Sequence, residues 1–149
     1  MGSSAGYKTQ DKNGYSQIFR KQWACSIEEL VTKMWATLSE GKEPGNGSQA
    51  IRNDLNNGRA FAALVICAYD KPFDSVEVDT HCDISDNGLF TIDVSDWKNW
   101  KVYNNSIGWK ESEEGKLGES VLLAMMDSEN GFQWVVDEEQ RKEIGEGIF

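Results

Sequence analysis

The sequence predicts one α+β domain, with N-terminal amphipathic helices packed on a mostly antiparallel sheet of about five strands and a short C-terminal helix. Three observations predict this class. A segment with helical spacing comes early, alternating segments dominate the second half, and a charged helical segment closes the chain. Residues 1–16 are polar and rich in Gly and Ser, so we expect a flexible segment there, with residues 17–149 forming the domain.

The first helix is predicted within residues 26–41. Ser26 and Glu29 match the S-x-x-E capping box, which satisfies backbone donors at a helix start, and Gly41 is the expected end. The apolar residues recur three and four positions apart, as on one helix face: Ile27, Leu30, Val31, Met34, Trp35 and Leu38. We expect this face to lie in the core.

Two further elements are predicted before residue 70. Ser48 to Asn57 is expected to form a short helix that ends at Gly58, with Ile51 and Leu55 as a thin apolar stripe. The run "AFAALVICAY" at residues 60–69 is continuously apolar. We expect it to form a central strand, because strands buried on both faces have this pattern.

A β-hairpin is predicted over residues 75–94. In "SVEVDTHCDI", the apolar side is Val76, Val78, Thr80, Cys82 and Ile84, and the polar side is Glu77, Asp79, His81 and Asp83. "SDNG" has the residues of a tight turn, since Asn and Gly tolerate positive φ. "LFTIDV" is expected to return with Phe90, Ile92 and Val94 on its apolar side.

The rest of the chain predicts strands and one helix. "WKVY" is expected to be a strand, and "SVLLAMMD" and "FQWVVD" flank "SENG" as a second hairpin. "SVLLAMM" also fits a helix, because short apolar runs are ambiguous. Residues 137–147 are expected to form a short helix, with acids leading, Arg141 and Lys142 following, and Gly145 at the end.

Composition indicates a cytoplasmic protein. No run approaches the roughly 18 apolar residues of a membrane-spanning helix, and the first 16 residues lack the apolar centre of a signal peptide. The three cysteines, Cys25, Cys67 and Cys82, are an odd number without a C-x-x-C pair. A disulfide framework is therefore not expected.

Negative charge is concentrated in the second part of the chain. The net charge is −10, from +2 in residues 1–60 and −12 in residues 61–149. Such a field repels nucleic acid and anionic membranes and attracts basic partners. We therefore expect a basic protein partner, without direct nucleic-acid or membrane binding; the alternative is that the charge serves solubility alone.

The only histidine does not predict a catalytic or metal site. His81 shares a strand face with Asp79 and Asp83, but neighbours on such a face are about 7 Å apart and diverge. Cys82 points to the other face, so it cannot activate or be activated by His81. The nucleophile and phosphate-binding motifs G-x-S-x-G, G-x-G-x-x-G and the P-loop are absent. No catalytic residue, metal or cofactor is expected.

An aromatic segment is the clearest binding signal. Trp97, Trp100, Tyr103 and Trp109 alternate with Lys98, Lys101 and Lys110. Three interpretations are open: the rings belong to the core, they anchor a protein interface, or they stack single-stranded bases between lysines.

These observations predict a small acidic binding module rather than an enzyme. We expect an inhibitor or immunity-type protein that neutralises a basic protein, such as a nuclease toxin. Its expected partner-binding residues are Glu77, Asp79, Asp83, Asp86, Asp93, Asp96, Trp97 and Trp100. The alternatives are a phage-type DNA mimic or anti-defence inhibitor, and a hydrolase that depends on carboxylates or on a His/Asp-bound metal.

Overall fold

The computed structural model describes residues 4–22, 24–39, 55–69, 76–79, 88–105, 120–139 and 141. Its elements are β1 (Ala5–Asp11), β2 (Gly14–Tyr15), β3 (Ile18–Lys21), α1 (Ile27–Leu38), α2 (Asn57–Ala68), β4 (Val76–Asp79), β5 (Leu89–Asp93), β6 (Asn99–Asn104), β7 (Val121–Asp127) and β8 (Gly131–Trp134). None of the helices in these ranges is long and apolar enough to cross a membrane.

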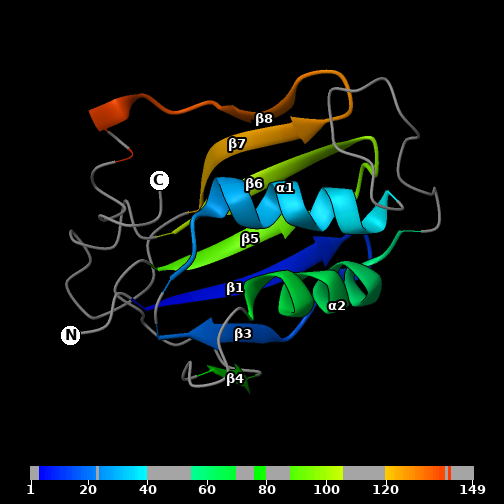
Figure 1. Ribbon diagram of the computed structural model, residues 1–149, viewed down its shortest axis with the longest axis vertical. Coiled ribbons are helices and arrows are strands. Elements are labelled where there is room, and N and C mark those ends of the chain that lie inside the picture. Colours follow the sequence, from blue (N-terminus) through cyan, green and yellow to red (C-terminus); the bar gives the residue numbers. More distant parts are fainter. Residues whose placement is uncertain are drawn as a thin grey trace.

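The elements form two layers, with α1 and α2 on one face of an eight-stranded sheet (Figure 1). The strand order is β4-β3-β1-β5-β6-β7-β8, and β2 pairs with β1. Only β1 and β5 are parallel; the other described pairs are antiparallel. The predicted α+β class with a mostly antiparallel sheet is confirmed, but the sheet is larger than the expected five strands.

Helix α1 agrees with its prediction. The backbone N–H of Glu29 donates to the Ser26 hydroxyl at 3.4 Å, so Ser26 is the N-cap. Five members of the apolar series are buried and Leu38 packs against them. The helix ends at Leu38 rather than near Gly41, which lies outside the described residues.

The predicted central strand at residues 60–69 is wrong, because this segment is helix α2. Its buried residues are Ala60, Ala63, Leu64 and Ala68, which share one helix face, whereas Ile66 is 69% exposed. Asn56 caps the helix by accepting the backbone N–H of Arg59 at 3.0 Å. The predicted end of a preceding helix, at Asn57 and Gly58, is therefore a helix start; residues 48–54 lie outside the described ranges.

The expected flexible segment at residues 1–16 is also wrong where the structure describes it. Ala5–Asp11 forms β1, which lies inside the sheet between β3 and β5. Lys12 and Asn13 connect it to β2. The side chains of Ala5, Tyr7 and Thr9 are fully buried, so this polar segment still contributes to the core.

The hairpin predicted across "SDNG" does not form. β4 pairs with β3, and β5 pairs with β1 and β6, so β3 and β1 lie between the two strands. The predicted strand residues remain correct over Val76–Asp79 and Leu89–Asp93. Residues 80–87, which include His81 and the first three residues of the predicted turn, lie outside the described residues; Gly88 is described and has φ of 72°.

The second predicted hairpin is confirmed. β7 and β8 pair antiparallel around Ser128–Asn130, and Gly131 has φ of 69°. "SVLLAMMD" is therefore a strand rather than a helix, and "WKVY" lies in β6. Of the predicted C-terminal helix, residues 138, 139 and 141 are helical, and residues 140 and 142–149 lie outside the described residues.

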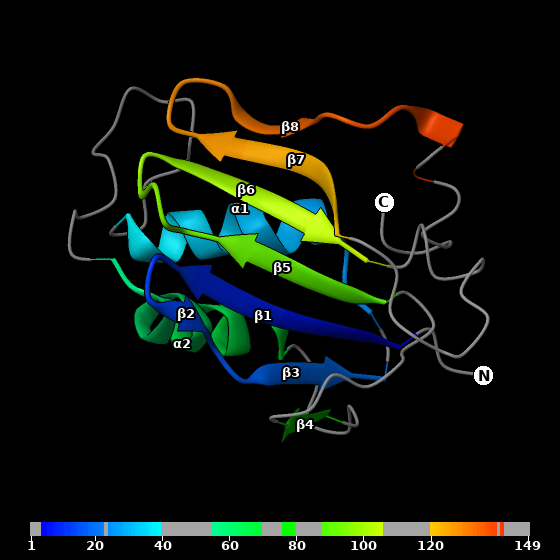
Figure 2. The ribbon, with the colours of Figure 1, turned by 180° about the vertical axis from the view of Figure 1, so that it is seen from behind.

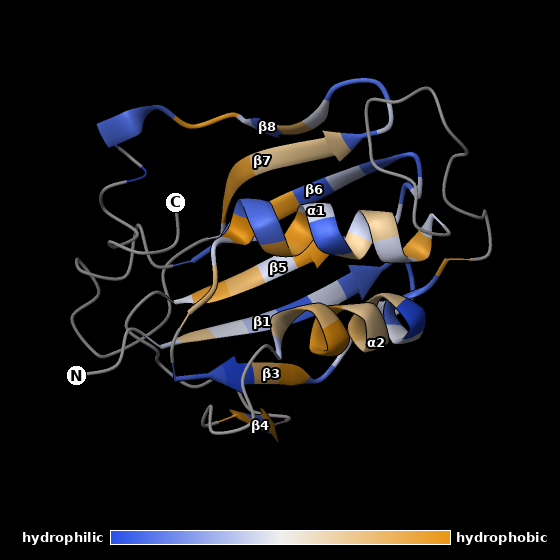
Figure 3. Ribbon diagram, in the orientation of Figure 1, coloured by the Kyte–Doolittle hydropathy of each residue, from blue (hydrophilic) through white to orange (hydrophobic). Residues whose placement is uncertain are grey.

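The core lies between the helices and the central strands, where α2 and β5 are largely hydrophobic (Figure 3). Trp35 of α1 packs on Trp100 of β6, with ring centroids 4.8 Å apart. Tyr7 of β1 stacks on Phe90 of β5 at 5.4 Å, and its hydroxyl contacts the backbone of Cys25 at 3.2 Å. Burial raises the pKa of Tyr7 well above its usual value, so it is a neutral core residue.

Candidate functional site

Two hollows flank the carboxyl ends of the parallel strands β1 and β5. The helix-side hollow, of about 410 Å³, is lined by Asp11, Lys12, Asn13, Leu55, Asn56, Val94, Ser95, Asp96 and Trp97. The open-face hollow, of about 240 Å³, lies on the sheet face opposite the helices and is lined by Lys8, Gln10, Tyr15, Thr91, Asp93, Tyr103 and Ser120. Ligand sites in sheets with parallel strands often occur at such carboxyl ends.

Two side-chain turns shape the loop between β5 and β6. The Asp93 carboxylate accepts the backbone N–H of Ser95 at 2.8 Å, and Asp96 accepts that of Lys98 at 3.0 Å. The backbone N–H of Val94 donates to the carbonyl of Gln10 at 2.8 Å, which ties the loop to β1. Aspartates commonly form such turns, so these two carboxylates are positioned by local structure.

Asp11 supplies a fixed negative charge to the helix-side hollow. Its carboxylate accepts the backbone N–H of Asn57 at 3.0 Å and that of Asn13 at 2.7 Å. Asn57 is the first residue of α2, so Asp11 also satisfies a donor at the positive end of that helix. These hydrogen bonds, the one from Asn57 first, hold the pKa of Asp11 below its usual value, and the carboxylate is ionised at neutral pH.

Trp97 lies at the boundary between core and solvent. Its half-buried ring packs against the core cluster while lining the helix-side hollow. The Nζ of Lys98 lies 5.1 Å from the ring centroid, in the range of a cation–π contact. A ring held by the core loses little conformational entropy when it contacts a partner, which suits an interface anchor.

Three of the eight predicted partner-binding residues line the two hollows. Asp96 and Trp97 lie together in the helix-side hollow, and Asp93 lies in the open-face hollow on the other side of the sheet. Trp100 is fully buried against Trp35, as the interpretation that its ring belongs to the core expects, and it exposes no surface in the described chain. Its alternation with Lys101 turns it toward the helices, leaving the lysine exposed on the other face.

The remaining predicted residues are elsewhere. Glu77 is exposed at the β4 edge and pairs with Arg20 of β3. Strand register places Glu77 about 20 Å from Asp93, so the two do not share one contact point. Asp79 is the last residue of β4, opposite Ile18. Asp83 and Asp86 lie outside the described residues.

Sequence reasoning missed the residues that β1 and β2 contribute to both hollows. Lys8, Asp11 and Tyr15 fall in the segment expected to be flexible. The dipeptide Asn13-Gly14 could have predicted a hairpin turn here, and therefore the two strands that flank it, because this dipeptide is typical of short hairpin turns.

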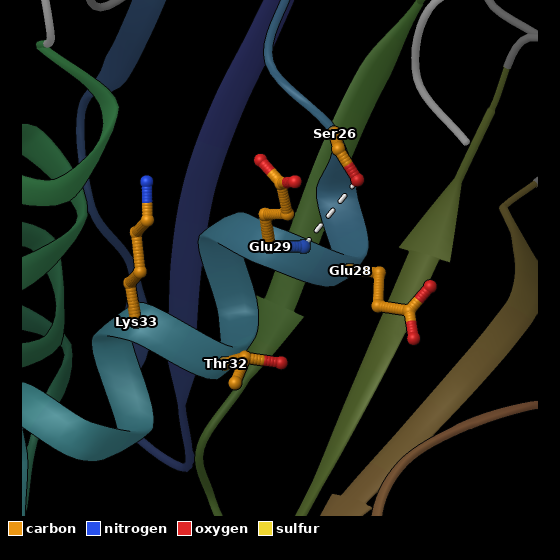
Figure 4. A pocket seen from close by; sticks show the side chains of 5 residues that line it. All are labelled: Ser26, Glu28, Glu29, Thr32 and Lys33. Carbon is orange, nitrogen blue, oxygen red and sulfur yellow. Dashed lines mark hydrogen bonds between the residues drawn. The ribbon is translucent and has the colours of Figure 1, made fainter. Parts of the chain in front are cut away.

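A third hollow, of about 570 Å³, lies beside the start of α1 and is lined by Ser26, Glu28, Glu29, Thr32 and Lys33 (Figure 4). The labelled acidic and basic side chains point in different directions and do not converge. Glu28 and Glu29 lie in the first helical turn, where negative charge is stabilised by the helix dipole. We therefore assign these residues to helix stability.

Described acids and bases are interspersed on the sheet face opposite the helices. Three described acids on the sheet face opposite the helices, Glu77, Asp93 and Asp127, alternate with Arg20, Lys8 and Lys101 rather than forming rows. Within the described ranges, no group of three His, Cys, Asp or Glu residues could hold a metal ion.

Comparisons with known proteins add no family assignment. A scan of protein-family models, a search of curated proteins and a search of solved structures each find no significant match.

Proposed function

We propose that this protein binds a basic protein partner through the carboxyl ends of β1 and β5 and thereby inhibits it, as an immunity-type protein inhibits a nuclease toxin. The observation that supports this most is the helix-side hollow, where the half-buried Trp97 lies beside Asp96 and the ionised Asp11. An aromatic ring with adjacent carboxylates suits a Lys or Arg side chain, which can contact the ring and pair with the acids.

Trp97 supplies the apolar contact in this proposal, and the acids supply attraction and orientation. Interface energy is usually concentrated in a few central residues, with Trp among the commonest. Complementary charge mainly accelerates encounter and selects the partner. Lys12 and Lys98 lie beside these carboxylates, so the surface favours a partner of matching charge pattern over a generic polycation.

The proposed inhibitor acts in the cytoplasm. The three cysteines of the sequence are an odd number without a C-x-x-C pair, unlike the disulfide framework of small secreted domains.

Differential capture tests the proposal. The full chain, the double variant Asp96→Asn/Trp97→Ala and the control Glu129→Gln/Val135→Ala are immobilised and exposed to a lysate of the source organism. Glu129 and Val135 are exposed on and after the β7–β8 hairpin, so the control makes a similar pair of changes elsewhere. We expect a basic protein to be retained by the wild type and control and lost from the site variant. Loss of a hot-spot contact of about 2 kcal/mol weakens binding roughly thirtyfold.

Two outcomes contradict the proposal. One is that every specifically retained protein is acidic or neutral. The other is that the site variant and the control retain the same proteins in equal amounts.

A further inference from the structure

The open-face hollow combines aromatic and polar side chains on a sheet surface that the described helices leave uncovered. Figure 2 shows this side, with the sheet in front of both helices. Tyr7 and Trp100 point toward the helices, so alternation turns Lys8, Lys101 and Tyr103 to the opposite face. Cross-strand pairing puts Lys8, Thr91 and Tyr103 in one row.

The neighbouring row carries the other side chains of the hollow. It runs from Tyr15 through Gln10 and Asp93 to Lys101. Tyr15 is 59% exposed, and the Nζ of Lys8 lies 3.8 Å from its ring centroid. Tyr15 and Tyr103 therefore lie on opposite sides of the polar side chains that line the hollow.

We propose that this face binds single-stranded nucleic acid. Tyr103 and Tyr15 provide stacking surfaces for bases, and Lys8 and Lys101 provide cations for the backbone phosphates. Asp93 and Gln10, between the tyrosines, present acceptors and donors that can pair with base edges. Single strands expose these edges and ring faces, which a duplex keeps paired and stacked.

The spacing of the tyrosines favours an oligonucleotide over a free nucleotide. Tyr15 lies three strands away from Tyr103 across the sheet, and the two are offset by two residues along the strand direction. Their Cα atoms are therefore about 16 Å apart. One base cannot stack on both rings across this distance. The two tyrosines therefore contact different bases of one strand.

This proposal departs from the expectation, based on net charge, that the protein avoids nucleic acid. Among the side chains that the structure describes on this face, Lys8, Arg20 and Lys101 are interspersed with Glu77, Asp93 and Asp127. Arg20 and Glu77 pair with each other away from the hollow. The face therefore attracts nucleic acid only locally, at about two phosphates that Lys8 and Lys101 contact. This number of contacts predicts a slope of about −1.4 for the logarithm of the affinity against the logarithm of the salt concentration.

Fluorescence anisotropy of the full-length protein tests the inference. The probes are labelled single-stranded DNA and RNA of about 15 nucleotides, the matching duplexes and labelled mononucleotides, in about 50 mM salt. The variants are Tyr15→Ala, Tyr103→Ala and Lys101→Ala. Controls are Tyr69→Ala and Lys33→Ala, an exposed tyrosine and lysine in the helix layer. Circular dichroism checks that each variant is folded.

We expect saturable binding of a single strand, with duplexes and mononucleotides weaker. Each tyrosine variant is expected to weaken binding by about fivefold to about 150-fold, since stacking is worth about 1–3 kcal/mol per base, and the controls are expected to match the wild type. Because Tyr15 is largely exposed, its variant tests stacking even if Tyr103→Ala unfolds.

The inference is overturned if no single strand binds, if duplexes or mononucleotides bind as well as single strands, or if Tyr15→Ala binds like Tyr69→Ala. Asp96→Asn/Trp97→Ala changes the helix-side hollow alone, so it is expected to leave oligonucleotide binding intact. Failure of partner capture and failure of oligonucleotide binding are therefore separate results.

Discussion

Replacing Trp100 with alanine is expected to destabilise the fold by about 3–5 kcal/mol, the usual cost of truncating a buried aromatic residue. Its side chain is fully buried, and its ring packs on Trp35 at 4.8 Å with the planes inclined by 56°. The indole nitrogen has no hydrogen-bond partner among the described residues, so the loss comes from packing. A domain of this size has a total stability of about 5–15 kcal/mol, which makes the loss large.

The neighbouring Trp97 provides the comparison. Its ring is half-buried, so Trp97→Ala is expected to cost about 1 kcal/mol. Urea unfolding followed by far-ultraviolet circular dichroism measures both variants. A double-mutant cycle with Trp35→Ala is expected to give a coupling of about 0.5–1.5 kcal/mol with Trp100→Ala.

The core position of Trp100 is contradicted if Trp100→Ala destabilises the fold less than Trp97→Ala does, or if its cost lies within about 1 kcal/mol of zero. Either result would mean that Trp100 is not a core residue and would favour its assignment as an interface anchor. If Trp100→Ala does not fold, Trp100→Phe keeps an aromatic ring at the site and is expected to be less destabilising.

Two further predictions concern the strands. The lowered pKa of Asp11 means that its charge stabilises the fold above its unfolded pKa of about 3.9 and that this stabilisation is lost as the pH falls through the folded pKa. Asp11→Asn should therefore melt lower than the wild type at pH 7, and the difference in melting temperature should narrow as the pH is lowered below about 3.9; a difference that does not change with pH would contradict the assignment. Gly131→Ala should cost about 1–2 kcal/mol in urea unfolding, because φ is 69° there, and Gly131→Asn should cost less. Equal stability of Gly131→Ala and the wild type would refute this.

Local sequence signals predicted α1 and the β7–β8 hairpin because each is specified by neighbouring residues. The apolar spacing from Ile27 to Leu38 is long enough to distinguish a helix, and Ser26 marks its start. Asn130 and Gly131 mark the turn of the hairpin. Both elements follow from contacts within about 14 residues of sequence, so no distant partner is needed to define them.

Helix α2 could not be predicted from the spacing of apolar residues alone. Ten consecutive apolar residues satisfy a strand and a helix equally, and tertiary packing decides which forms. The frequent alanines were the better guide, because Ala has the highest helix propensity and its small side chain allows close packing on the sheet. Ala60, Ala63 and Ala68 occupy the buried face.

The sequence also did not predict which strands pair with each other when they are far apart in the chain. β1 has a polar composition, but it lies between β3 and β5 because Tyr7 and Thr9 are covered by the helices. β4 and β5 are strands with the expected faces, yet they pair with β3 and β1 rather than each other. The turn residues of a hairpin do not determine pairing when a central strand competes for the same edge.

The candidate site was only partly predictable for the same reason. Residue type alone indicates Asp93, Asp96 and Trp97, which lie at the end of β5 and in the loop that follows it. Asp11 and Lys8 join them only through the parallel pairing of β1 with β5, across about 80 residues of sequence. Trp100 was assigned to an interface because residue type does not reveal which side of a strand faces the helices.

The proposed inhibitory binding is tested most directly by the salt dependence of association with the captured basic partner. Stopped-flow association rates are measured over a salt series for the wild type, Asp96→Asn/Trp97→Ala and the control Glu129→Gln. We expect the wild-type and control rates to fall steeply as salt is added, and the double variant to associate more slowly with a shallower salt dependence. A wild-type rate that does not change with salt, or a double variant that behaves like Glu129→Gln, would contradict it.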